Sequence, residues 1–226
     1  MMAQKRRERR RTKFRRRVKL YMRVGTFLLI SLMVVLIGMK FFGVGPFDKY
    51  TERDETQMRV AKPEVAVSLL TVNPYSRPGT KSEKINEIVI HYTANPGTSA
   101  KQNRNYFENL KDSKTTKASS HFIVGIKGEI IQCVPTWEIA YASNHRNLDT
   151  VSIETCHLRD DGTYTEETYE SLVQLTAWLC EKFGLTEDDV IRHYDITGKI
   201  CPKYFVEDED AWEQFKLDVK NVLKES

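Results

Sequence analysis

The sequence has no internal repeat and no long low-complexity stretch. Its composition is 40% hydrophobic and 29% charged, so a fibrous repeat and a wholly disordered chain are both excluded as general descriptions. The length of 226 residues allows one domain of ordinary size plus an appendage, but not two large domains.

Acidic residues are almost missing from the amino-terminal segment. Residues 1–23 contain 12 Lys and Arg but a single acidic residue, Glu8, whereas from Phe41 onward 30 Asp and Glu outnumber 22 Lys and Arg. The net charge of +4 therefore conceals a basic head on an acidic body. An acidic body gives no support for a nucleic-acid-binding domain, so we expect no nucleic-acid partner.

Charge is missing altogether from Val24–Met39, which is rich in Leu, Ile, Val, Met and Phe. The apolar character resumes beyond Lys40, and residues 24–44 would span about 31 Å as a helix, enough to cross a bilayer core. A cleaved signal peptide is the alternative, but this run is longer and no A-x-A-like cleavage site follows it. A core helix is also disfavoured, because nothing before Arg23 could fold around it. We expect an uncleaved transmembrane anchor.

The basic residues before the anchor predict its orientation. By the positive-inside rule, residues 1–23 would lie in the cytoplasm and everything after Pro46 outside the cell membrane. A nucleic-acid-binding arm is the alternative, but a place directly before a spanning helix favours orientation and attraction to anionic lipid. Residues 45–63 are rich in charge and poor in apolar side chains, which predicts a linker to a domain over residues 64–226.

Segments typical of strands and helices are interspersed along this body, which predicts an α/β fold with a sheet covered on both sides. The Lys127-Gly128 pair predicts a hairpin, and Gly184 predicts the end of a helix. The expected strands are Asn86–Tyr92, His121–Ile126, Glu129–Val134, Val151–Cys156 and Val190–His193, and the expected helices are Thr98–Leu110, Thr165–Phe183 and Asp208–Leu223.

Two histidines and a cysteine stand where strands end. His91 closes one predicted strand, His193 closes another, and Cys201 follows eight residues later in a loop. Two imidazoles and a thiolate can form a tetrahedral zinc site with its fourth position open, which is the arrangement that hydrolysis needs. The spacing therefore predicts Zn²⁺ as a cofactor.

Four segments carry a family resemblance. In chain order, IVIHYTANPGTSA, ASSHFIV, VSIET and RHYDITGKICP resemble the zinc-dependent N-acetylmuramoyl-L-alanine amidases, which share their fold with the peptidoglycan recognition proteins. The likeness covers roughly Val65–Leu223, and its last segment is the most specific. It implies a central mixed β-sheet flanked by helices. It also implies hydrolysis of the amide between N-acetylmuramic acid and L-alanine in peptidoglycan, which would be the substrate.

The resemblance implies a role for each matching residue. His91 and His193 match the two zinc histidines, and Cys201 matches a third ligand that is Asp in some members and Cys in others. Glu154 matches the glutamate that acts as general base, and Lys199 matches a lysine that steadies the oxyanion. Water as nucleophile, a base and a positive charge are the three requirements of amide hydrolysis.

The chain also departs from the family. Some phage members carry a catalytic tyrosine where this chain has Ser120, so the role of base falls to Glu154. Many members carry a substrate-contacting histidine in the stretch where this chain has Tyr141, and His145 follows a little later. Tyr141, His145 and Asn105, the last from a helix that resembles the cleft-side helix of the family, are candidate substrate contacts.

Several residues keep a second interpretation. Asp195 could orient a zinc histidine or cap a turn, and Glu154 could be a structural partner of a loop instead of a base. His121 is expected to be structural or to line the cleft wall, and His157 is expected at the surface.

Three cysteines remain once Cys201 is counted as a ligand, an odd number for an exported domain. Cys133 and Cys156 could form a disulfide, or both could be buried thiols like Cys180.

Two other functions fit the same pattern: a non-catalytic peptidoglycan-binding module of this fold, and an amidase for a different amide. The joint presence of Cys201, Glu154 and Lys199 favours the enzyme. The sequence makes no prediction of oligomeric state.

Overall fold

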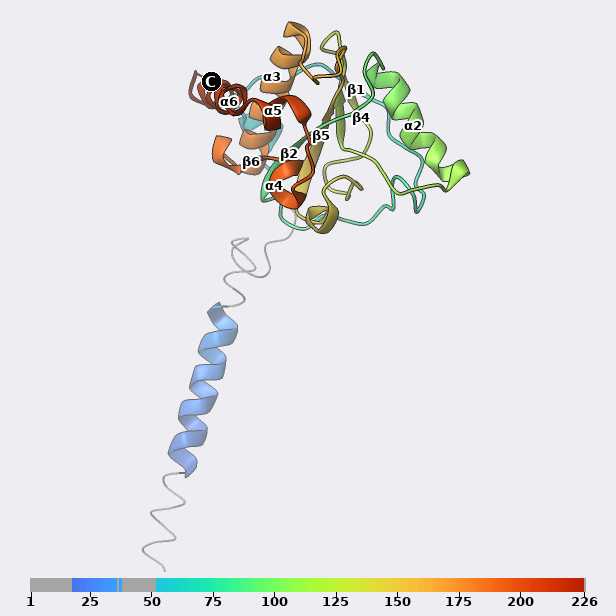
Figure 1. Ribbon diagram of the computed structural model, residues 1–226. Helices are drawn as coiled ribbons and strands as arrows, with labels where there is room; N and C mark the ends of the chain where they lie inside the picture. Colours follow the sequence, from blue (N-terminus) through green and yellow to red (C-terminus); the bar gives the residue numbers. More distant parts are fainter. Residues whose placement is uncertain (1–17, 36, 38–51, 226) are drawn as a thin grey trace, which may run out of the picture. The chain divides into compact units, whose positions relative to one another are not determined.

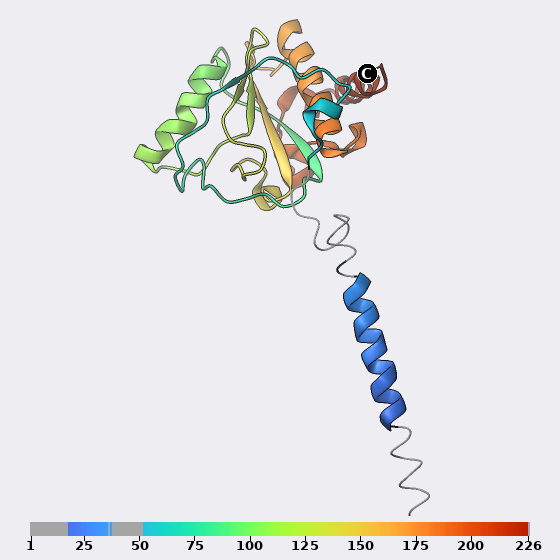
Figure 2. The same cartoon turned by 180° about the vertical axis from the view of Figure 1, so that it is seen from behind.

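The computed structural model describes residues 18–35, 37 and 52–225, which belong to two separate units (Figures 1 and 2). The first unit contains a helix over Val18–Val35 with a mean hydropathy of 1.8, and none of this window is buried. By length and composition it could cross a membrane. It begins six residues before the predicted anchor, while residues 1–17, 36 and 38–44 of the predicted basic segment and anchor lie outside the described residues.

The second unit is built on a six-stranded sheet with the order β1-β4-β3-β5-β2-β6. Only β3 and β4 are antiparallel, so the sheet is mixed, as expected, and they form the hairpin that Lys127-Gly128 predicts. The three-residue strand β1 was not predicted, because it is too short to show a period of two. The strands are β1 (Val65–Val67), β2 (Glu87–Tyr92), β3 (Phe122–Val124), β4 (Ile130–Gln132), β5 (Thr150–Thr155) and β6 (Val190–Arg192).

Helices cover both faces of the sheet, with α2 on one side and α3 and α6 on the other (Figures 1 and 2). The long helices begin and end close to the predicted residues: Ser99 and Thr165 cap the amino termini of α2 and α3, and Gly184 ends α3 at a φ of 68°. The helices are α2 (Ala100–Ser113), α3 (Glu166–Phe183), α4 (His193–Thr197), α5 (Lys203–Glu207) and α6 (Glu209–Glu225).

Two hydrophobic cores lie on the two faces. The larger core joins the sheet to α3, α5 and α6, and it contains an aromatic cluster of Phe205, Trp212 and Phe215, in which Phe215 stacks on both other rings. The smaller core lies under α2 and contains Phe107 and Leu110. Successive side chains of a strand point to opposite faces of the sheet, so each strand contributes side chains to both cores.

The charged segment before β1 is not the free linker that its composition predicts. Residues 52–62 pack on α3: the carboxylate of Glu181, 4% exposed, accepts hydrogen bonds from the backbone N–H groups of Arg59 (3.0 Å) and Val60 (2.7 Å). Val60 is buried in the larger core, and Lys182 pairs with Glu52. Composition misled here because a few backbone donors and one buried valine dock the segment despite its charge. The folded domain therefore includes residues before 64.

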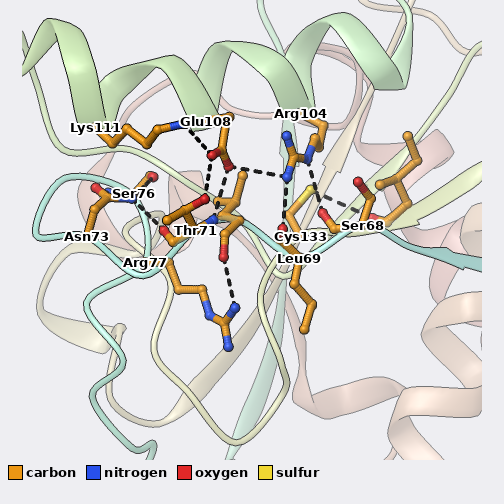
Figure 3. A network of polar contacts seen from close by, with 12 residues as sticks. Ser68, Leu69, Thr71, Asn73, Ser76, Arg77, Arg104, Glu108, Lys111 and Cys133 are labelled. Atoms are coloured by element: carbon orange, nitrogen blue, oxygen red, sulfur yellow. Dashed lines mark hydrogen bonds and ion pairs between the residues drawn. The ribbon is translucent and has the colours of Figure 1, made fainter.

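A polar network fastens the chain after β1 to α2 (Figure 3). Glu108 accepts hydrogen bonds from the hydroxyl of Thr71 (2.7 Å), the backbone N–H of Thr71 (3.1 Å) and the ammonium of Lys111 (2.6 Å). Arg104 pairs with Glu108 and donates to the carbonyl groups of Ser68 and Leu69. One carboxylate thus joins a helix to a segment about 37 residues away.

Candidate metal centre

The site begins with two neighbouring parallel strands. His91 of β2 lies in register opposite Glu154 of β5, and neighbouring strands are about 4.8 Å apart. Ile90 and Ile153, the preceding residues, both point into the larger core. Because side chains alternate, His91 and Glu154 both project from the opposite face. The pairing of the two strands therefore places a carboxylate beside an imidazole.

The other two ligand candidates arrive from the edge strand and the loop after it. Arg192 of β6 is in register with Ile90, so His193, the next residue and the first of α4, lies beside His91. The chain then turns back, and the backbone N–H of Tyr194 donates to the carbonyl of Cys201 (2.9 Å). This turn places the thiol of Cys201 next to His91 and His193.

His91, His193 and Cys201 form one buried cluster whose ligand atoms all lie within 4.8 Å of one another. The Nδ1 atom of His91 is 3.8 Å from the Sγ atom of Cys201, and the two imidazole centroids are 4.7 Å apart. The structure thus brings together the three residues that the sequence predicts as ligands.

The protonation states suit a metal cation. Burial, with the charges of His193 and Lys199, holds the pKa of His91 well below its usual range, and burial with Lys199 lowers the pKa of His193. Both imidazoles are therefore neutral, the form that binds metal. Burial raises the pKa of the Cys201 thiol to about 12, although a backbone hydrogen bond from Tyr92 opposes this. A dication would deprotonate such a thiol, so this donor set fits zinc.

Glu154 is the unpaired polar group of the site. Its Oε2 atom is buried and has no hydrogen-bond partner among the described residues. Burial raises the pKa of this carboxyl to about 8, and the charge of Lys199 opposes the rise. Lys199 is exposed, so it supplies its charge from the solvent side. A buried oxygen without a partner can accept a proton from a bound molecule.

Two loop residues that the sequence did not single out contact the histidines. The Oδ1 atom of Asn144 lies 2.9 Å from Nε2 of His193, and the Oγ atom of Ser143 lies 3.5 Å from Nε2 of His91. Neither residue belongs to a motif of the sequence, and only the fold brings their loop to the strand ends.

The candidate substrate contacts lie in two places. Tyr141 and His145 lie on the loop that carries Ser143; the Tyr141 ring is 5.3 Å from the Lys117 ammonium, and His145 is exposed in a short 3₁₀ turn. Asn105 is exposed on α2, and no hydrogen bond joins it to the three ligands within the part of the chain that the structure describes.

The contacts of Asp195 and His121 decide between the two roles that the sequence allows for each. Asp195 caps α4, since its carboxylate accepts from the backbone N–H and the guanidinium of Arg192. His121 is structural, as expected: it is buried between Ser152 and the carbonyl of Glu138, with burial lowering its pKa to about 4. The prediction for His157 is wrong.

His157 is 1% exposed and its ring stacks on that of Tyr92, with centroids 5.2 Å apart. The loop after β5 folds back over the strand ends, which the sequence did not reveal. All four cysteines are free and buried, so Cys133 and Cys156 are buried thiols and do not form a disulfide.

A comparison with protein families identifies a family that this chain matches. Residues 81–204 match the model of a family described as N-acetylmuramoyl-L-alanine amidase. That range contains all three ligand candidates, Glu154 and Lys199.

Curated relatives carry the same description. The chain is 35% identical over 173 residues to the N-acetylmuramoyl-L-alanine amidase CwlL of Bacillus licheniformis, covering 71% of this chain and 48% of the relative. It is 36% identical over 174 residues to the N-acetylmuramoyl-L-alanine amidase BlyA of Bacillus subtilis (strain 168), covering 68% of this chain and 46% of the relative. The chain therefore spans about half the length of the curated relatives it matches.

Solved structures with the same fold include a mutant endolysin from Bacillus subtilis, with 26% identity and a TM-score of 0.60. They also include the catalytic domain of XlyA, with 25% identity and a TM-score of 0.59. Each alignment covers 70% of this chain and 99% of the solved chain. The expected architecture of a mixed sheet flanked by helices is confirmed.

Proposed function

Because this chain belongs to the N-acetylmuramoyl-L-alanine amidase family, we propose that it is a zinc-dependent enzyme that hydrolyses peptidoglycan. The bond cleaved is the amide between the lactyl group of N-acetylmuramic acid and L-alanine of the stem peptide. The observation that carries the proposal is the buried cluster of His91, His193 and Cys201 beside the unpaired carboxylate of Glu154.

The three clustered side chains would hold the zinc ion. Three protein ligands are the number found in catalytic zinc sites, where the fourth position stays open. Bound zinc supplies Lewis acidity to the scissile carbonyl and to the attacking water. Lys199, exposed at the mouth of the site, places a positive charge where the carbonyl oxygen becomes negative.

Glu154 would carry the proton. Its carboxylate takes a proton from the attacking water as the water oxygen bonds to the lactyl carbonyl carbon. The C–N bond then breaks, and the same proton passes to the nitrogen of L-alanine, which leaves as an amine. A dication bound beside Glu154 would keep its carboxylate ionised, which is the form that can accept the proton.

The substrate would lie across the mouth of the site. Tyr141 and His145, on the loop beside the zinc histidines, would contact its glycan or peptide from one wall. Asn105, exposed on α2, would contact a more distant part of the same polymer. These three contacts follow from the family resemblance and from the exposure of His145 and Asn105.

The amino-terminal helix would anchor the enzyme in the cell membrane as a single-pass protein. Its apolar composition and its basic flank support a cytoplasmic amino terminus and an amidase domain outside, facing the peptidoglycan. The acidic body would adhere poorly to an anionic wall, so the anchor would supply the local concentration.

The decisive experiment incubates the full chain in detergent with purified peptidoglycan, with and without a zinc chelator, followed by restoration of zinc. We expect chelator-sensitive release of α-amino groups belonging to L-alanine, and no new reducing sugar ends. New reducing ends would identify a glycosidase instead. Zinc and wall binding with neither product would identify a non-catalytic recognition module, and release only from soluble fragments would identify a different amidase.

A pair of variants tests the third ligand. Cys201→Asp keeps a negatively charged donor, so we expect it to bind zinc and retain part of the activity. Cys201→Ala removes the donor and should lose both. Stoichiometric zinc of undiminished affinity in Cys201→Ala would contradict the ligand assignment.

A further inference from the structure

Both proposed zinc histidines contact one loop through the same ring nitrogen. His193 Nε2 meets Oδ1 of Asn144 at 2.9 Å, and His91 Nε2 meets Oγ of the adjacent Ser143 at 3.5 Å. The other nitrogen of His91, Nδ1, is the one that lies 3.8 Å from the Cys201 sulfur. The loop thus lies on the other side of the His91 ring from Cys201, and it meets His193 through the same ring atom, Nε2.

We propose that Asn144 and Ser143 are positioning residues that hold both histidines with the proton on Nε2, so that Nδ1 of each ring is free to bind the metal. The inference rests on the proposed zinc site and names what orients its ligands. An amide oxygen is only an acceptor, so His193 must donate to Asn144 through an Nε2–H group. The hydroxyl of Ser143 can accept in the same way, which allows His91 the same tautomer. Such outer contacts fix the ring and make a histidine a better ligand.

The loop that carries the two residues is itself fixed by side chains. Oδ1 of Asn147 accepts hydrogen bonds from the backbone N–H groups of Ala142 (3.1 Å) and Ser143 (2.7 Å), and so closes the turn. Arg146 pairs with Glu87 (2.6 Å) at the start of β2 and with Asp149 (2.9 Å) just before β5.

The loop is therefore fastened to the two strands that carry His91 and Glu154. Any shift of the loop would have to break contacts to both strands, so it presents Ser143 and Asn144 in one position.

The backbone of Asn144 points to a function for its side chain. Its φ of 55° lies in the left-handed region, which costs free energy for residues other than glycine, although asparagine tolerates it best. Glycine would satisfy this turn without any side chain. Such strain at a site commonly accompanies a functional constraint, and here the amide of Asn144 reaches His193. Glycine is therefore the informative substitution, because it removes the amide without straining the backbone.

The first test measures Zn²⁺ affinity of the full chain in detergent, by competition with a chromophoric chelator. Asn144→Gly should bind Zn²⁺ about 10- to 100-fold more weakly, the usual cost of losing such a partner. Asn144→Asp keeps an acceptor at the same place and should stay within a few-fold of the parent. Lys114→Gly is the matched control: Lys114 also has a left-handed φ, 54°, but it caps α2 away from the cluster. Its affinity should be unchanged.

The second test needs no metal. Long-range ¹H–¹⁵N spectra of histidine-labelled, zinc-free chain report the tautomer of each neutral imidazole. We expect the Nε2–H tautomer for His193 in the parent and in Asn144→Asp, and a mixture of tautomers in Asn144→Gly. A parent that holds His193 as the Nδ1–H tautomer, or equal Zn²⁺ affinity in Asn144→Gly and the parent, would overturn the inference. A parent that binds no Zn²⁺ would overturn the proposed function instead, and the tautomer spectra would still decide this point.

Discussion

At the scale of single residues, burial makes the site neutral in the absence of a cation. The pKa values of His91 and His193 are lowered, while those of Cys201 and Glu154 are raised, and desolvation is the largest cause in all four. Uncharged forms reduce the cost of burying four ionisable groups in one place. A bound dication would reverse this preference for the thiol and the carboxyl. Without a metal all four side chains can be buried in their uncharged forms, and with a metal bound Cys201 and Glu154 would be anionic.

Glu154→Gln tests the base. Glutamine keeps the size of the side chain but cannot take a proton, so we expect turnover to fall by roughly 10²- to 10⁴-fold. Zinc content and thermal stability should stay close to those of the parent, since no ligand changes. Amino-group release from peptidoglycan measures the first effect, and metal analysis with thermal denaturation measures the second. Glu170→Gln, an exposed change on α3, is the control. Turnover within a few-fold of the parent in Glu154→Gln would assign the base role elsewhere.

At the scale of elements, two carboxylates attach segments that have little hydrophobic surface of their own. Glu108 joins α2 to the chain after β1 (Figure 3), and Glu181 joins residues 52–62 to α3. Hydrogen bonds to charged groups contribute more than neutral ones, and a buried donor left without its acceptor is costly. Single substitutions should therefore loosen whole segments.

Glu108 should make the stability of the domain depend on pH. Burial opposes its ionised form, but hydrogen bonds from Lys111 and Thr71 outweigh burial and lower its pKa from 4.5 to about 2. Because the pKa of Glu108 is lower in the folded state, its ionised carboxylate contributes fully to the free energy of unfolding above about pH 5. This contribution is lost as the pH falls toward 2. Glu108→Gln should therefore lose roughly 2 kcal/mol of unfolding free energy at pH 7 and much less at pH 3.

Urea unfolding of the parent and the variant at both pH values measures this difference. Asp112→Asn, which removes an exposed charge from the same helix, should show no such pH-dependent gap. A gap of equal size at pH 3 and pH 7 for Glu108→Gln would argue against its ionisation as the cause.

Glu181→Ala should release the segment before β1. The change leaves the backbone N–H groups of Arg59 and Val60 without their acceptor, at a cost of about 1 to 3 kcal/mol for each. We expect a lower melting temperature and faster cleavage by trypsin after Arg53 and Arg59. Mass spectrometry of the first fragments locates the cuts. Glu170→Ala on the same helix should match the parent, and unchanged cleavage in Glu181→Ala would show that the carboxylate does not hold the segment.

At the scale of the whole molecule, charge and hydropathy divide the chain into a basic, apolar amino-terminal part and an acidic amidase domain. Residues 1–23 carry 12 of the 35 Lys and Arg residues, and the last six of these positions begin the apolar helix over Val18–Val35. An acidic domain gains little from electrostatic attraction to an anionic wall, so the proposed anchor would decide where it works.

Fractionation of cells that express the chain tests the anchor. We expect the chain to stay with membranes through washes with high salt and alkaline carbonate, and to be extracted by detergent. Deletion of residues 1–49 should move the protein to the soluble fraction, because the apolar helix is lost. Release of the full chain by salt alone would point to electrostatic adsorption through the basic residues. Release with a new amino terminus after the apolar run would point to a cleaved signal peptide.

The sequence alone determined the local features that depend on neighbours along the chain. The apolar pattern and Gly184 predicted a helix over Thr165–Phe183, which is α3 to within one residue. Apolar runs predicted β2 and β5, also to within one residue. The motifs around His91, His193 and Cys201 predicted the three residues that the structure brings into one cluster, because a family resemblance is carried by short contiguous segments. The VSIET motif predicted Glu154, which lies in register with His91.

Tertiary structure decided everything that depends on contacts between distant segments. The charged residues 52–62 gave no hydrophobic pattern, yet Glu181, more than 120 positions later, provides the acceptor that docks them. His157 was expected at the surface because only the return of its loop buries it against Tyr92. Asn144 lies 49 positions from His193, and no local pattern marks it as a partner of a ligand. Such contacts arise only when the sheet sets the strand ends side by side, because their free energy depends on distance in space and not along the chain.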